Sequence, residues 1–303
     1  MFKEAKKSFR RNWALYLILC IPVTYIILFC YVPMYGAQIA FKDYQLTYSI
    51  SESRWVGFSY FTTFFSNYMF ERLIFNTLKL SLYSLLTFPI PILFAVLLQY
   101  MPGRRFAKTI QMVTYAPHFI STVVMCSMIL EFLSTRGGIV NILLNNLGID
   151  TIDFMGEPKY FAGVYVWSGV WQSMGYSSII YISALTSVDP TLHEAATIDG
   201  ASLVRRIWHI DLPGIMPMIT IMLVLRCGSL LSIGHEKVLL LQNDLNYTTS
   251  EVIQTYVWKM GITAKIPQYS YSSAVGLFTS VINFVMLVLM NTIANRMSGS
   301  SLW

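Results

Sequence analysis

Long apolar segments are the feature that most constrains how this chain can fold. Six segments of the 303-residue chain are each close to the roughly 20 residues that a helix needs to cross a bilayer. They are predicted at 13–35, 76–100, 111–133, 161–185, 215–233 and 273–294. Only 12% of the residues are charged, against about 25% in soluble domains. The sequence therefore predicts an all-α, polytopic membrane protein with six transmembrane helices.

The first segment is too long for the apolar core of a signal peptide, so we expect an uncleaved span. Pro89 and Pro91 lie inside the second segment and predict a kinked or locally broken helix there. The expected organisation is a cytoplasmic segment 1–12, a transmembrane domain 13–294 and a cytoplasmic tail 295–303.

Basic residues are unevenly divided between the two sides of this arrangement, and both termini of a six-span chain lie on the same side. Eleven cations lie on the side of the termini: Lys3, Lys6, Lys7, Arg10, Arg11, Arg104, Arg105, Lys108, Arg205, Arg206 and Arg296. The longer loops of the other side carry eight: Lys42, Arg54, Arg72, Arg136, Lys159, Lys237, Lys259 and Lys265. Because cytoplasmic loops are enriched in Lys and Arg, we expect both termini in the cytoplasm.

The net charge of +6 does not indicate a nucleic-acid partner, because the cations cluster at the ends of spans. Four cysteines fall inside apolar runs without paired spacing and are interpreted as small buried hydrophobes: Cys20, Cys30, Cys126 and Cys227. Four scattered histidines show no metal-ligand spacing: His118, His193, His209 and His235. No metal site and no catalytic constellation are predicted.

The polar segment 187–213, between the fourth and fifth spans, has structure of its own. Asp189 can cap a helix that begins at Pro190, and Gly200 supplies a bend. A short amphipathic run follows, with Leu203, Ile207 and Ile210 expected inward and Arg205 and Arg206 outward. Leu212-Pro213 is expected to turn the chain back toward the membrane. The segment is predicted as a helix, a bend and a second helix on the cytoplasmic surface.

The same segment resembles the coupling loop of the membrane subunits of binding-protein-dependent ABC importers. The pattern is Glu-Ala-Ala, three residues, Gly, nine residues and Ile-x-Leu-Pro, and it is matched by Glu194, Ala195, Ala196, Gly200, Ile210, Leu212 and Pro213. The runs 225–231, 269–278 and 301–303 are similar to permeases of large-oligosaccharide and polysaccharide importers.

The resemblance implies a type I permease fold, a multi-pass protein of the cell membrane, and a helix between spans four and five that docks into a cleft of an ATP-binding subunit. Ala195 and Ala196 would permit close approach, Glu194 would pair with a basic residue, and Asp199 would precede the bend. The implied partners are a second permease in a heterodimer, two ATP-binding subunits, an extracytoplasmic solute-binding protein and an oligosaccharide. Because the chain has no phosphate loop, ATP and Mg are expected on the partner subunits, and the chain is not expected to be an enzyme.

Three ionisable residues lie inside the predicted spans and cost about 2.5–3.5 kcal/mol each if they face lipid at a helix centre: Lys79, Glu131 and Arg226. Lys79 and Glu131 are candidates for the substrate path, but both are close enough to a span end for their charged groups to reach the surface, which is at least as good an interpretation. Arg226, about three turns into the fifth span, either pairs with Glu131 or lines the substrate path.

The fourth span offers flat apolar faces and polar groups of the kind that bind sugars, carried by Trp167, Trp171, Gln172 and Tyr176. A belt of aromatic residues at the outer membrane interface is an equally good interpretation of the same residues. The alternative to an ABC permease is a stand-alone secondary transporter or channel. Such a protein needs an intramembrane acid or histidine relay, and Glu131 is the one clear acid in the spans.

Overall fold

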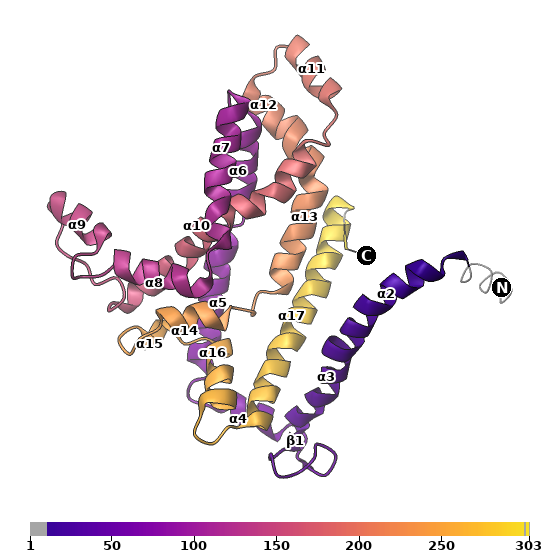
Figure 1. The fold of residues 1–303 in the computed structure, drawn as a ribbon, viewed down its shortest axis with the longest axis vertical. Helices are drawn as coiled ribbons and strands as arrows, with labels where there is room; N and C mark the ends of the chain where they lie inside the picture. Colours follow the sequence, from indigo (N-terminus) through magenta and orange to yellow (C-terminus); the bar gives the residue numbers. More distant parts are fainter. Residues whose placement is uncertain (1–10, 300, 303) are drawn as a thin grey trace. The chain divides into compact units, whose positions relative to one another are not determined.

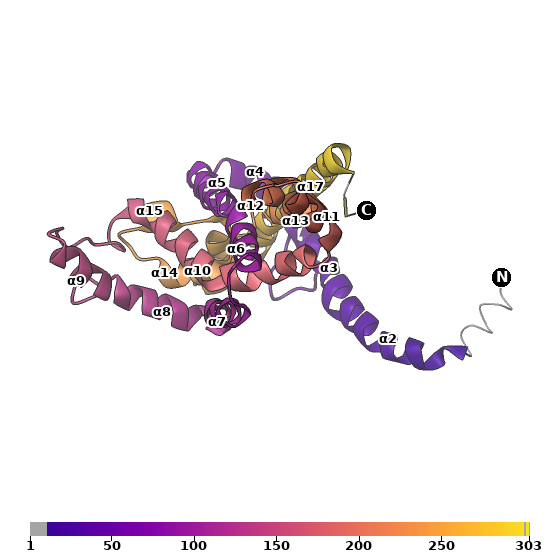
Figure 2. The ribbon, with the colours of Figure 1, turned by 90° about the horizontal axis from the view of Figure 1, so that it is seen from above.

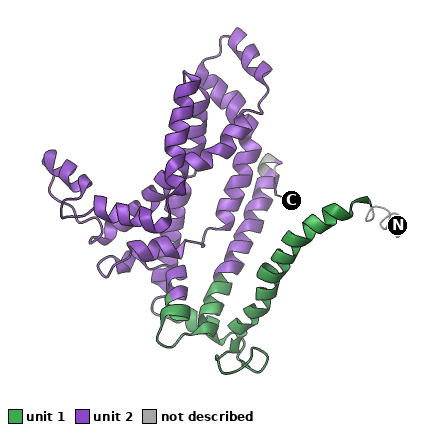
Figure 3. Cartoon of the chain, viewed as in Figure 1, with its two compact units in different colours: residues 1–67, 259–278 green, residues 68–258, 279–303 purple. Residues whose placement is uncertain are grey.

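The computed structural model describes residues 11–299 and 301–302. Predictions made for residues 1–10 and for Trp303 lie outside the described residues. The chain divides into two compact units, which are 1–67 with 259–278 and 68–258 with 279–303 (Figure 3). In the described part, the strands are one short antiparallel pair, β1 (Lys42–Asp43) with β2 (Arg54–Trp55), in unit 1. The predicted all-α class is confirmed.

The first span is one apolar helical stretch in unit 1. It consists of α2 (Trp13–Ile26), the π-helical η1 (Ile27–Tyr31), α3 (Val32–Met34) and the 3₁₀ turn η2 (Tyr35–Phe41). Pro33 lacks an N–H and crowds the preceding turn. The π-helical segment ends at Tyr31, two positions before Pro33, and its wider turn accommodates the proline, so the helix continues past it. The apolar side chains of α2 are exposed in the chain, as expected for a surface that faces lipid or another subunit.

The rest of unit 1 is built around aromatic side chains. It contains α4 (Ser59–Phe65), the π-helical η5 (Lys259–Thr263) and the beginning of α17 (Tyr269–Ser298). Phe64 is buried and meets the rings of Tyr271 and Phe278 edge-on. The backbone N–H of Tyr44 donates to Ser270 Oγ at 2.9 Å. Residues far apart in the sequence therefore close this unit.

The second span, in unit 2, is broken as predicted. Two residues separate the end of α5 (Phe70–Leu86) from Pro89, which is the first residue of α6 (Pro89–Gln99). Proline is well suited to the first turn of a helix, where its missing N–H costs nothing.

The predicted span 111–133 is not one continuous helix. The chain forms α7 (Arg104–Tyr115), the 3₁₀ turn η3 (Ala116–Phe119) and α8 (Thr122–Phe132), and α7 with η3 is bent from α8 by 101°. Pro117 interrupts the first helix, and Ser121 caps the second by accepting from the backbone N–H of Val124 at 3.3 Å. Figures 1 and 2 both show α8 and α9 (Ile139–Asn146) as an arm leaving the body of unit 2.

The fourth predicted span is a 28-residue helix, α10 (Pro158–Leu185), which packs against α6, α7 and α13. Among the described residues, four helices are long and apolar enough to cross a membrane, or five if the bent pair is one span, and α10 is not among them. Helix α10 is long enough, but many of its residues are polar. Such a composition suits a helix that lines a cavity rather than one surrounded by lipid.

The remaining elements of unit 2 follow in chain order. They are α11 (Pro190–Ile198), α12 (Leu203–Arg206), the π-helical η4 (Ile207–Asp211), α13 (Leu212–Gly228), α14 (His235–Leu241), α15 (Tyr247–Ser250), α16 (Ile253–Trp258) and the rest of α17. One apolar core joins α5, α8, the start of α10 and α14, and a second joins α6, the end of α10 and α13. The predicted sixth span lies within α17, whereas the fifth ends at Gly228 instead of residue 233.

Candidate functional site

Helix α11 begins as the sequence predicts. The Asp189 carboxylate accepts a hydrogen bond from the backbone N–H of Thr191 at 2.9 Å, and Pro190 is the first helical residue. That backbone bond, and then a side-chain bond from Thr191, lower the pKa of Asp189, so the cap is charged at neutral pH. A negative charge at this end also complements the helix dipole.

Helix α11 ends at Gly200 in a Schellman motif. The N–H of Ala201 bonds to the carbonyl of Ala196 at 2.8 Å, and the N–H of Gly200 bonds to the carbonyl of Thr197 at 3.1 Å. Gly200 has a φ of +71°, a conformation that glycine adopts without steric cost. The predicted bend is confirmed, and its positive φ favours a glycine at this position.

The residues between these caps form an exposed surface at the tip of unit 2 (Figure 1). Glu194 and Ala195 are exposed, and Ala196 is half-buried. Two apolar side chains of the same helix face solvent, Leu192 at 52% and Ile198 at 87% exposure. A short helix with exposed apolar groups and small residues is suited to bind another protein.

The sequence predicted that the chain turns back at Leu212-Pro213. This prediction is wrong. Ser202 caps α12, and the helix then runs from Leu203 through Pro213 to Gly228. The π-helical η4 lies directly before Pro213 and accommodates the missing N–H, as η1 does before Pro33. The motif residues Ile210, Leu212 and Pro213 therefore belong to the base of a long helix.

Two orientations predicted for this run are also wrong. Leu203 is 44% exposed, although Ile207 and Ile210 are half-buried as expected. Arg205 is exposed, but Arg206 points back toward α11 and donates from Nη1 to Thr197 Oγ1 at 3.1 Å. The bend at Gly200 brings α11 within reach of this arginine.

A buried carboxylate joins α11 to the two helices behind it. Asp211, at 2% exposure, has one oxygen 3.3 Å from His193 Nε2 of α11. Its other oxygen accepts a hydrogen bond of 2.5 Å from the hydroxyl of Tyr100, at the end of α6. Burial and the bond to Asp211 raise the pKa of Tyr100 to about 12, so the phenol stays protonated and is the donor.

We expect Asp211→Ala to destabilise the protein by about 1–3 kcal/mol, because it leaves the Tyr100 hydroxyl and His193 without their acceptor. Asp199→Ala, at an exposed position of the same loop, should change stability by less than about 0.5 kcal/mol. Thermal unfolding of the two purified variants in detergent compares them. Equal unfolding temperatures would show that Asp211 does not hold the loop to the helices.

A cavity of about 960 Å³ lies between α5, α6, α10 and α13 in unit 2. Its polar lining is rich in hydroxyl groups, from Ser84, Thr87, Tyr165, Ser173, Tyr176, Ser177, Tyr181, Ser183 and Ser229. Phe88 and the tyrosines add aromatic surface, and Gln172 adds an amide. Two lining residues are basic, Arg226 and Lys237, and none is acidic. This lining combines the hydrogen-bonding groups and flat apolar faces that bind sugars.

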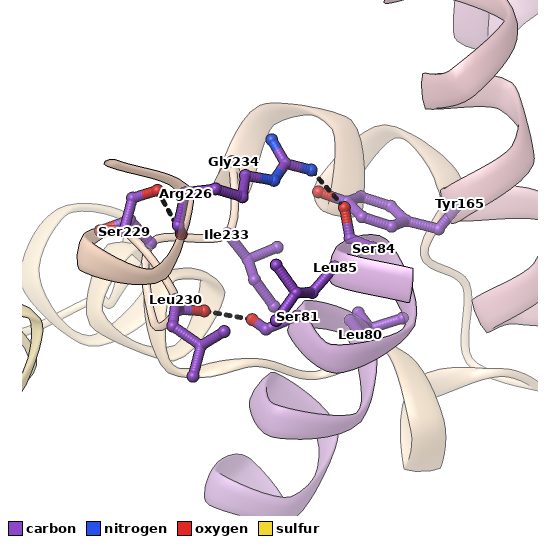
Figure 4. A pocket seen from close by; sticks show the side chains of 11 residues that line it. Leu80, Ser81, Ser84, Leu85, Tyr165, Arg226, Ser229, Leu230, Ile233 and Gly234 are labelled. Atoms are coloured by element: carbon purple, nitrogen blue, oxygen red, sulfur yellow. Dashed lines mark hydrogen bonds between the residues drawn. The ribbon is translucent and has the colours of Figure 1, made fainter. Parts of the chain in front are cut away.

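Arg226, predicted about three turns into a span that ends at residue 233, lies in the last turn of α13, which ends at Gly228. It lines both this cavity and a smaller adjoining one of about 220 Å³, where its guanidinium donates to Ser84 Oγ at 2.5 Å (Figure 4). Figure 4 also shows Tyr165 pointing toward the guanidinium. In the described residues, no carboxylate oxygen lies within ion-pairing distance of Arg226, and Glu131 is an exposed residue at the end of α8.

The other predicted path residues are divided between the cavity and the surface. Gln172 lines the cavity and donates to the carbonyl of Ile120 at 2.9 Å. Tyr176 also lines the cavity, and its ring stacks on the ring of His118 with 3.8 Å between the ring centres. Trp167 is half exposed and donates to the Tyr83 hydroxyl at 2.8 Å. Trp171, Lys79 and Glu131 are exposed and do not line the cavity.

Lys237, on α14, is a cavity residue that the sequence analysis missed. Its ammonium donates to the carbonyl of Tyr165 at 2.7 Å and lies 4.7 Å from the centre of the Tyr165 ring. Gly169 on α10 leaves room for it, because a Cβ at that position would be 3.1 Å from Lys237 Nζ. A lone lysine before the apolar run Val238–Leu241 was the only signal in the sequence.

The sequence of residues 88–299 matches the family described as "Binding-protein-dependent transport system inner membrane component". The chain belongs to this family. The permease is 39% identical to Protein LplB of Bacillus subtilis over 98% of this chain and 93% of the relative. It is also 39% identical to the polygalacturonan/rhamnogalacturonan transport system permease protein YteP of the same bacterium, over 95% of this chain and 90% of the relative.

Solved structures give the same assignment. The permease superposes with a TM-score of 0.89 on a chain of a bacterial alginate ABC transporter in complex with an alginate pentasaccharide-bound periplasmic protein. The two are 36% identical, and the match covers 98% of this chain and 99% of the other. The resemblance carried by the Glu-Ala-Ala motif is thus confirmed: the chain is a transport permease subunit of an ABC importer and not an enzyme. The alternative of a secondary transporter or channel finds no support.

Proposed function

We propose that this permease carries an oligosaccharide inward as one of two permease subunits, in a complex with two ATP-binding subunits and an extracytoplasmic solute-binding protein. The cavity between α5, α6, α10 and α13 is its share of the sugar's path. ATP and Mg are bound by the partner chains. Among the described residues, no group of three or more His, Cys, Asp or Glu side chains is arranged to hold a metal.

The observation that carries this proposal is a physical connection between the exposed helix and the cavity. Helix α11 is tied through His193 and Asp211 to the start of α13, and through Tyr100 to the end of α6. Both α13 and α6 contribute residues to the cavity wall, among them Arg226 and Pro91. A force applied to α11 therefore reaches two walls of the cavity through the buried carboxylate of Asp211.

The mechanism follows from this connection. An ATP-binding subunit holds α11 by its small residues Ala195 and Ala196 and by the charge of Glu194. When the two ATP-binding subunits close, α11 moves with them and carries the bases of α6 and α13. The rigid Gly200 turn and the Asp211 contacts transmit the movement, and the two permease bundles rock around the sugar.

This function requires α11 and both termini in the cytoplasm, where ATP is. We expect a reporter fused after Ser187 to be active on the cytoplasmic side, and reporters fused after Asp150 or Ser250 on the external side. Two reporters are fused at each position, alkaline phosphatase and a fluorescent protein, and each is active on one side of the membrane. The activities of the two reporters are compared at the same position. The reverse pattern would exclude α11 as the contact to the ATP-binding subunits.

A further inference from the structure

Two cations face the cavity without a carboxylate to neutralise them. In the part of the chain that the structure describes, no aspartate or glutamate oxygen is within ion-pairing distance of Arg226 or Lys237, and the cavity lining contains no acid. Arg226 donates to a serine hydroxyl, and Lys237 to a backbone carbonyl. Both acceptors are neutral, so the positive charges remain available to a ligand.

The two cations differ in burial: Arg226 is exposed on the cavity wall, whereas Lys237 is half-buried and bears the larger cost of leaving water. Removing a cation from water costs free energy, and a neutral acceptor returns only part of that cost. Burial lowers the pKa of Lys237 to about 8, so the ammonium is still mostly protonated at neutral pH. Gly169 keeps the space around the ammonium open, whereas a larger residue at that position would displace it.

The two groups also have unused donors. A guanidinium has five N–H groups and an ammonium has three, and one contact of each is made to the protein here. Their common neighbour is Tyr165, whose ring lies under Lys237 and whose side chain points toward Arg226 (Figure 4). The cavity that these two residues line also presents hydroxyl groups and apolar side chains.

We propose that Arg226 and Lys237 form an anion-binding pair for the carboxylate groups of an acidic oligosaccharide, such as one built from uronic acids. The proposal rests on the proposed function, since it takes the cavity to be the path of the sugar. The hydroxyl-bearing side chains of the lining favour a carboxylated sugar over a lipid phosphate, because they can form hydrogen bonds with the hydroxyl groups of a sugar. Arginine can bind a carboxylate with two hydrogen bonds, and lysine adds a second positive charge to the lining of the same cavity.

The test uses the whole complex in vesicles, with ATP inside and the loaded solute-binding protein outside. The probes are a galacturonate trimer, a mannuronate trimer, the methyl ester of the galacturonate trimer and a neutral arabinose trimer. The variants are Lys237→Gln, Lys237→Met, Lys237→Arg and the double variant Arg226→Gln with Lys237→Gln. Lys159→Gln is the matched control, because Lys159 is an exposed cation paired with Glu157 at the start of α10.

We expect the wild-type complex to import an acidic trimer. Lys237→Gln and Lys237→Met should each lower that rate about tenfold, because a charge-assisted hydrogen bond is lost. The double variant should lower it further, Lys237→Arg should retain most of it, and Lys159→Gln should leave it unchanged. Uptake of the methyl ester or the neutral trimer, where it occurs, should not respond to the change at Lys237.

Three results would overturn the proposal. If the complex imported only neutral trimers, the proposed function would stand, but Arg226 and Lys237 would not bind the carboxylates of the transported sugar. Failure to import any probe would remove the proposed function together with the anion pair. If the Lys237 variants lost the second permease subunit on co-purification but imported acidic trimers normally in the assembled fraction, the cations would pair with an acid of that subunit.

Discussion

Gly200→Pro is expected to abolish the coupling of ATP hydrolysis to uptake while the protein still inserts into the membrane. Proline fixes φ near −65°, whereas Gly200 has a φ of +71°. Proline also lacks the N–H that bonds to the carbonyl of Thr197. The helix end would therefore open, and α11 would no longer be presented at a fixed angle to its partner. The measurement is ATPase activity, with and without loaded binding protein, beside uptake in vesicles.

A graded series at the same position separates strain from a general loss of folding. Asparagine tolerates positive φ, so Gly200→Asn should retain most uptake. A residue with an ordinary Cβ costs about 1–2 kcal/mol in this conformation, so Gly200→Ala should lower uptake roughly tenfold, and Gly200→Val more. All four variants should reach the membrane in equal amounts. If proline, valine and asparagine gave the same uptake, the left-handed turn would have no role in coupling.

Arg226→Met is expected to lower uptake by about tenfold, with assembly and basal ATPase activity unchanged. This effect is expected because Arg226 lines both cavities and donates a hydrogen bond to Ser84, whereas it forms no ion pair with Glu131. Glu131→Met should have little effect, because Glu131 is exposed and does not line the cavity.

The double variant Arg226→Met with Glu131→Met decides between the two interpretations of this arginine. An ion pair predicts that the double change is tolerated far better than Arg226→Met alone, since removing one partner strands the other. The structure predicts no such rescue. Uptake rates for the two single variants and the double variant, each normalised to assembled complex, supply the comparison. Recovery in the double variant would remove Arg226 from the sugar's path.

The coupling loop could be predicted from the sequence because its structure is local. The cap at Asp189, the start at Pro190 and the bend at Gly200 each depend on neighbouring residues, and the structure contains all three. The broken second span is local in the same sense, since Pro89 alone determines where α6 begins. The continuation through Pro213 was missed because π-helical turns such as η4 leave no simple pattern in a sequence.

Contacts between distant segments could not be predicted. The burial of Lys237 depends on Gly169 and on a carbonyl of α10, and Asp211 meets Tyr100 from another span. Arg226 was placed too deep because the apolar residues after Gly228 continue the pattern of a span although the helix has ended. The polar face of α10 was the one available sign of a cavity. The prediction relied on the aromatic residues of this helix, although more of the residues that line the cavity carry hydroxyl groups.

The proposed function of this chain is to provide a path for a sugar and to couple its transport to ATP hydrolysis on other subunits. Its most direct test is the uptake of a labelled oligosaccharide into vesicles that contain the permease with or without its partners. We expect uptake only when the second permease, the ATP-binding subunits, ATP and the loaded binding protein are all present, and we expect Gly200→Pro to abolish it. Uptake by this chain alone, driven by an ion gradient without ATP, would contradict the account.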